Sequence, residues 1–76
     1  VWSIGEYTMR ETLLKAALSH AQGHINKHLA NIEVYMERPV GVGEHPDIME
    51  AIEMELEQVA KYDDQIEMIQ KYFLKK

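Results

Sequence analysis

Residues 39–46 read Pro-Val-Gly-Val-Gly-Glu-His-Pro and form the clearest break in this chain of 76 residues. Proline removes a backbone donor and glycine permits conformations that other residues avoid, so this composition is typical of a turn. Pro39 also ends any helix before it, because the residue that precedes a proline avoids the helical region. We therefore expect the chain to reverse direction here, between two longer regular segments.

Upstream of this break, an apolar face recurs at alternating steps of three and four residues. That spacing indicates one side of an α-helix. Its members are Leu14, Leu18, Ala21, Ile25, His28, Ile32 and Tyr35. Leu29 and Met36 widen the face on one side, as is typical of a helix in a bundle.

The start of this first helix has two candidates with the spacing of a capping box. One pairs Ser3 with Glu6, and the other pairs Thr8 with Glu11. Aromatic residues in staple positions on either side of Ser3 favour the earlier one. We place the first helix from about 4–8 to 38.

Downstream of the break, a second apolar face begins after Asp47. Asp47 and Glu50 suit the positive end of a helix dipole, and the lysines after residue 70 suit its negative end. The periodic residues are Ile48, Ile52, Leu56, Val59, Tyr62, Ile66, Ile69 and Phe73. We place the second helix at about 47–73, with the loop at 39–46.

The sequence thus predicts one all-α domain over residues 1–76, an antiparallel hairpin of two long helices. A core of this size is small, and the absence of cysteine excludes disulfide support. Each apolar face is also wider than one helix contact, so Leu29, Met36, Met49 and Leu56 would stay exposed in a lone hairpin. We therefore predict a homodimer that forms a four-helix bundle. The predicted self-association residues are Leu14, Leu18, Ile25, Leu29, Ile32, Met36, Ile52, Leu56, Val59, Ile66, Ile69 and Phe73.

The net charge of −5 lies entirely in the second half of the chain. An acidic surface repels nucleic acid, so we expect no direct binding to DNA or RNA. Lys61 is the only basic residue between positions 47 and 70. This imbalance predicts an acidic face that could attract a basic protein partner, or that simply keeps the helix soluble. Its residues are Glu50, Glu53, Glu57, Asp64 and Glu67.

A row of histidines, His20, His24 and His28, climbs one side of the first helix at steps of four. Histidines four apart can chelate zinc, nickel or copper. A complete site needs a further ligand, which a carboxylate of the second helix such as Glu50, Glu53 or Glu57, or a partner subunit, would have to supply. The alternative, which we favour, is an exposed His20, a His24 at the edge of the helix contact and a His28 that fills the contact with a local hydrogen bond. No metal or cofactor is therefore expected.

Other motifs do not indicate an activity. His45-Pro46-Asp47 between two helices resembles the J-domains that stimulate Hsp70 ATPases, but the basic helix before the tripeptide and the lysine after it are missing. No serine, threonine or lysine lies in the pattern of an activated nucleophile. The start of the chain lacks the pattern of a signal peptide, and no apolar run could span a membrane. We expect a cytoplasmic protein that is not an enzyme.

The stretch Arg-Glu-Thr-Leu-Leu-Lys-Ala-Ala-Leu (10–18) and the turn Val-Gly-Val-Gly-Glu-His-Pro-Asp (40–47) before an acidic helix resemble short uncharacterised helical proteins of tailed phages that infect marine cyanobacteria. The resemblance implies a phage or marine metagenome origin, hence a host cytoplasm, and no particular activity. Our leading hypothesis from the sequence is a non-enzymatic structural or protein-interaction module that acts through its helix faces. The alternative is a metal-binding helical bundle that uses the histidine row.

Overall fold

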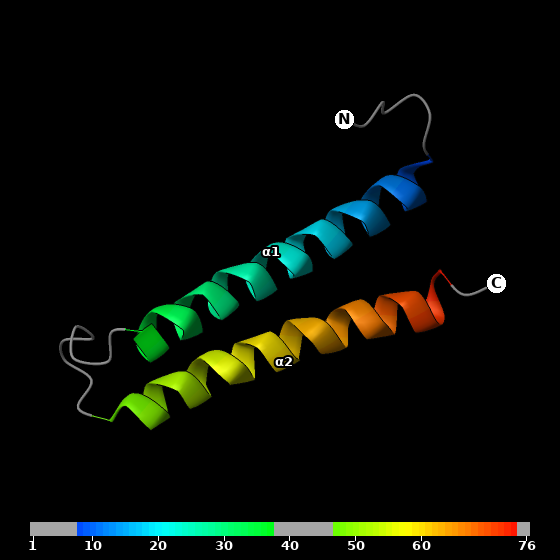
Figure 1. The fold of residues 1–76 in the computed structure, drawn as a ribbon. Helices are drawn as coiled ribbons and strands as arrows, with labels where there is room; N and C mark the ends of the chain where they lie inside the picture. Colours follow the sequence, from blue (N-terminus) through cyan, green and yellow to red (C-terminus); the bar gives the residue numbers. More distant parts are fainter. Residues whose placement is uncertain (1–7, 38–46, 75–76) are drawn as a thin grey trace.

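The protein forms an antiparallel hairpin of two long helices, as the sequence predicts (Figure 1). The computed structural model describes residues 8–37 and 47–74. Helix α1 spans Met9–Glu37 and helix α2 spans Ile48–Tyr72, and the described residues contain no strand. The dimensions of 50 × 25 × 16 Å describe a single layer of two helices. Such a layer has two broad faces and two edges open to solvent.

Each helix begins at a side-chain cap. The Thr8 hydroxyl accepts a hydrogen bond from the Glu11 amide at 3.1 Å, and the Glu11 carboxylate accepts one from the Thr8 amide at 3.0 Å. This reciprocal pair is a capping box, so α1 starts after Thr8, the later of the two candidates. Ser3 lies outside the described residues. At α2, extended Asp47 accepts a hydrogen bond from the Glu50 amide at 3.1 Å, which is the predicted start.

The contact side of α1 is the one that the sequence predicts. Ala21, Ile25 and Ile32 are buried, and the remaining members of the periodic row are half-buried. These residues lie on one side because three- and four-residue steps keep returning to the same side of a helix. The apolar periodicity therefore identified the α1 half of the core.

The contact side of α2 differs from the prediction at several positions. Leu56 and Phe73 belong to the predicted row, yet they are 49% and 53% exposed. Ala51 is buried and Glu55 is half-buried, although neither was in that row. Leu56 is exposed because the α2 contact follows the seven-residue line through Ile48, Glu55, Tyr62 and Ile69, which lies to one side of the centre of the apolar row. Phe73 is exposed as the C-cap residue, just beyond the last residue of α2.

The predicted loop at 39–46 lies outside the described residues, as do His45 and Pro46. Neither helix within 8–37 and 47–74 has an apolar stretch that could cross a bilayer. The all-α hairpin is confirmed, whereas the pairing of two hairpins into a four-helix bundle stays a prediction.

Candidate functional site

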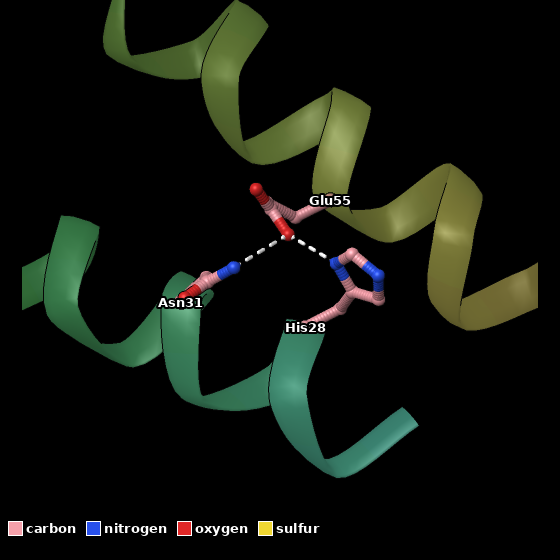
Figure 2. A network of polar contacts seen from close by, with 3 residues as sticks. All are labelled: His28, Asn31 and Glu55. Carbon is pink, nitrogen blue, oxygen red and sulfur yellow. Dashed lines mark hydrogen bonds and ion pairs between the residues drawn. The ribbon is translucent and has the colours of Figure 1, made fainter. Parts of the chain in front are cut away.

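The most developed polar site lies between the two helices, where Glu55 of α2 meets two side chains of α1 (Figure 2). Nδ1 of His28 lies 2.6 Å from Oε1 of Glu55, and the Asn31 amide donates to the same oxygen at 3.2 Å. An ionised carboxylate only accepts hydrogen bonds, so Nδ1 of His28 carries the proton. The side chains of His28 and Glu55 are only 13% and 18% exposed.

This polar contact sets how α1 and α2 align. The two residues lie 27 positions apart in the sequence, so the sequence's expectation of a local hydrogen bond for His28 was wrong. A second cross-helix bond joins the far ends of the hairpin, because Arg10 donates to the Phe73 carbonyl at 2.7 Å. Arg10 thereby places a cation at the carboxyl end of α2, where the helix dipole favours it. Both bonds join α1 to α2 in the antiparallel register of the hairpin.

The histidine row continues from His28 along one face of the hairpin and meets Tyr62 of α2. The Tyr62 ring stacks on His24, with centroids 4.4 Å apart and planes 8° from parallel. The edge of His20 meets His24 at 4.5 Å, and Nζ of Lys61 lies 5.1 Å from the Tyr62 ring. The three histidines and Tyr62 thus form a cluster of rings rather than a set of converging nitrogen atoms.

Two groups in this region have shifted pKa values. Partial burial, followed by the nearby charges of His20, Lys27, His28 and Lys61, lowers the pKa of His24 below 6.5. For Glu55, burial acts to raise the pKa, but the hydrogen bonds from His28 and Asn31, together with the charges of His28 and Lys27, outweigh it and hold the pKa below 4.5. His24 therefore favours its neutral form and Glu55 its charged form.

The directions of these two pKa shifts predict that the protein loses stability in two steps as the pH falls. Unfolded His24 binds a proton more readily than folded His24, so stability declines below about pH 6.5. Folded Glu55 resists protonation, so its contribution is present above pH 4.5 and is lost as the pH falls through its lowered pKa. We expect the melting temperature, measured by circular dichroism from pH 8 to pH 3, to fall in two stages.

Two variants separate these stages. His24→Gln is expected to reduce the first decline and leave the second, and Glu55→Gln is expected to do the opposite. If the melting temperatures of both variants depended on pH in the same way as that of the parent protein, the assignment of the two declines to His24 and Glu55 would be wrong.

The carboxylates that the sequence offered as further metal ligands do not approach the histidines. Glu50, Glu53 and Glu57 are exposed, and their helical positions place them on the side of α2 away from α1. The carboxylate that does reach the row is Glu55, and it binds His28. Within 8–37 and 47–74, no group of three or more histidine, aspartate or glutamate side chains is arranged to hold a metal ion.

We accordingly expect zinc at a stoichiometric concentration to leave the melting temperature nearly unchanged. A ligand that binds only the folded state at a hundred times its Kd adds about 2.7 kcal/mol to the free energy of unfolding. In a domain this small, that gain raises the melting temperature by several degrees. A rise of that size, lost in a His20→Ala/His24→Ala variant, would restore the metal-binding alternative.

A second candidate site is an exposed apolar face formed by Leu29, Met36, Met49 and Leu56. They are 45%, 59%, 63% and 49% exposed, in agreement with the expectation that a lone hairpin leaves them in water. Leu29 follows His28, and Leu56 follows Glu55, the residue that His28 contacts. Because α1 and α2 are antiparallel, a step of one residue from the contact turns toward the same broad face of the hairpin on both helices, so Leu29 and Leu56 lie on one face. Met36 and Met49 lie two turns nearer the loop, so the four form one apolar face beside the loop end of the hairpin.

The third candidate is the acidic face on the outer edge of α2. Its five members are all exposed. Their spacing of three, four and seven residues keeps them on one side of the helix, opposite the contact with α1. They are the predicted residues Glu50, Glu53, Glu57, Asp64 and Glu67. The structure therefore brings them together on one surface.

Sequence reasoning missed Glu55, Asn31 and Arg10 as cross-helix partners. The available signal was the seven-residue line in α2, in which Glu55 occupies a contact position between Ile48 and Tyr62. A carboxylate in such a line predicts a polar partner on the facing helix, because an unpaired buried charge is costly. His28 occupies the corresponding polar position in the row of α1.

No protein-family model, curated protein or solved structure matches this sequence.

Proposed function

We propose that this chain is a non-enzymatic interaction module in the cytoplasm, and that its working form is a homodimer in which two hairpins make a four-helix bundle. The observation that carries the proposal is the exposed apolar face of Leu29, Met36, Met49 and Leu56. A second copy of the same hairpin offers a surface of matching length and chemistry. The predicted self-association residues on both helices then become one continuous core.

The modest core of the lone hairpin supports this proposal. Among the described residues only Ala21, Ile25, Ile32 and Ala51 are buried, and two of these are alanines. Full burial of an isoleucine contributes about 1.5–3 kcal/mol, and an alanine contributes less. Ordering each residue costs about 1–2 kcal/mol of backbone entropy, so further apolar burial is needed for a stable fold. Dimerisation supplies that burial without a disulfide or a metal.

Light scattering with size-exclusion chromatography tests the proposal directly. At micromolar concentration we expect a particle of twice the chain mass of 8.9 kDa. Dilution is expected to lower the melting temperature, because folding and association are then linked by mass action. A cooperatively folded monomer, with a melting temperature independent of concentration, would refute the homodimer.

We further propose that the acidic face binds a basic protein surface, a role that leaves the apolar face free for the second copy. The observation that favours it is the exposure of all five carboxylates on one side of α2, where Lys61 is the only basic residue between positions 47 and 70. A row of like charges produces a field that attracts cations and is screened by salt.

Charge reversal tests this role, with a lysine-rich helical peptide as the probe. Glu53→Lys/Glu57→Lys on α2 is expected to weaken binding of the peptide at low salt at least tenfold and to leave the helical circular dichroism signal intact. Glu33→Lys/Glu37→Lys on α1 is the matched control, since it makes the same charge change on exposed positions of the other helix. Equal weakening by both variants would show a response to net charge only, and would contradict a specific acidic face.

A further inference from the structure

We infer that the two hairpins of the dimer lie with their loops at the same end, so that α1 of each copy packs beside α2 of its partner. This inference deepens the proposed homodimer and rests on it. The juxtaposition that carries it is the uneven distribution of apolar residues along one face of the hairpin, together with the unequal charges of the two helices.

The face that includes Leu29 and Leu56 changes character along its length. Steps of seven residues from these two leucines remain on the same side of each helix. Toward the loop the steps reach Met36 and Met49, which are apolar and exposed. Away from the loop they reach Gln22 and Asp63, which are polar and exposed. One half of the face is therefore apolar and the other half is polar.

Two hairpins can stack on this face about a twofold axis in two ways. If the axis runs along the helices, the loops lie at the same end and α1 packs beside the partner's α2. If the axis crosses the helices, the loops lie at opposite ends and each helix packs beside its own copy. An isologous interface brings the same patch of both copies together, so the axis decides which halves meet.

The same-end arrangement matches the apolar half of one copy with the apolar half of the other. Leu29 then faces the partner's Leu56, and Met36 faces the partner's Met49, in the register that already holds within each hairpin. Polar residues meet polar residues farther from the loop, where Gln22 faces the partner's Asp63. With the two hairpins overlapping along their full length, the opposite-end arrangement instead sets the apolar half against the polar half, which leaves polar groups covered by methionine and leucine side chains.

Charge favours the same arrangement. Helix α2 carries seven acidic side chains and two lysines, whereas α1 carries three acidic and three basic side chains and has no net charge. In the opposite-end dimer the two acidic helices lie side by side and repel each other. In the same-end dimer every α2 has α1 helices as its neighbours, so like-charged helices lie only across the diagonal of the bundle.

Cysteine cross-linking tests the arrangement, because the natural chain contains no cysteine. Chains with Gln22→Cys and chains with Asp63→Cys are mixed, refolded together and oxidised. We expect a disulfide-linked heterodimer from the mixture and little linked product from either variant alone. In the opposite-end dimer Gln22, near the middle of α1, lies close to its own copy across the axis, so Gln22→Cys alone would link and would overturn the inference.

The control pairs Gln22→Cys with Gln65→Cys. Gln65 is exposed and lies two residues beyond Asp63, so it points to the opposite side of α2. This mixture is expected not to link, and linkage equal to that of the Asp63 mixture would contradict the proposed face. Light scattering on the natural chain is the separate readout. A monomer there refutes the homodimer itself, whereas a dimer with the wrong cross-links refutes only the arrangement.

Discussion

Ile25→Asp is expected to abolish the folded structure. Ile25 lies at the centre of the α1 contact and is 7% exposed, so the new carboxylate would have neither water nor a cationic partner. The loss of isoleucine packing alone costs about 2–5 kcal/mol, and an unpaired charge in an apolar contact adds to it. The core of a chain this short supplies only about 3–5 kcal/mol, so the free energy of unfolding becomes negative. Far-ultraviolet circular dichroism should show the loss of helix.

Asn26→Asp is the matched control for this variant. It adds the same charge one position further along α1, at an exposed residue. We expect its spectrum and melting curve to stay close to those of the parent protein, because exposed substitutions usually change stability by about 0.5 kcal/mol or less. A folded Ile25→Asp variant would show that the hairpin contact between α1 and α2 is not the core of the protein.

Leu56→Glu is expected to dissociate the proposed homodimer. Leu56 is half exposed in the hairpin, so it loses its remaining exposure only when a second copy covers it. Full burial of a leucine contributes about 1.5–3 kcal/mol, of which about half remains to be gained at the half-exposed Leu56, and the twofold symmetry repeats the substitution at two places in the interface. Each 1.4 kcal/mol changes Kd by about tenfold, so the Kd of dimerisation should rise at least about tenfold. Sedimentation equilibrium measures this change.

Met54→Glu separates a loss of interface from a general effect of charge. Met54 is also on α2 and is 57% exposed, but it lies two residues from Leu56 and so points to the other side of the helix. The Kd of dimerisation of the Met54→Glu variant is expected to stay within a few-fold of that of the parent protein. If Met54→Glu dissociates the dimer and Leu56→Glu does not, the second copy binds the face that carries the histidine row.

Several features of the fold could be predicted from local sequence. Pro39 and the glycines after it mark the reversal, and the three- and four-residue spacing identifies Ile25 and Ile32 as core residues. The cap at Asp47 also follows from the sequence, because a capping bond joins residues only three positions apart. Each of these features depends on interactions within one turn or one helix, which neighbouring residues determine.

The details of the site depend on contacts between residues far apart in the sequence. The row from Ile48 to Phe73 is wide enough to permit several rotations of α2, and only the packing against α1 brings Glu55 into the contact and leaves Leu56 exposed. The sequence by itself therefore determined that there are two amphipathic helices and where they reverse. The tertiary structure alone decided which side of α2 faces α1, because the rotation and register of a helix pair are set by interhelical contacts such as that between His28 and Glu55, and local periodicity contains no information about them.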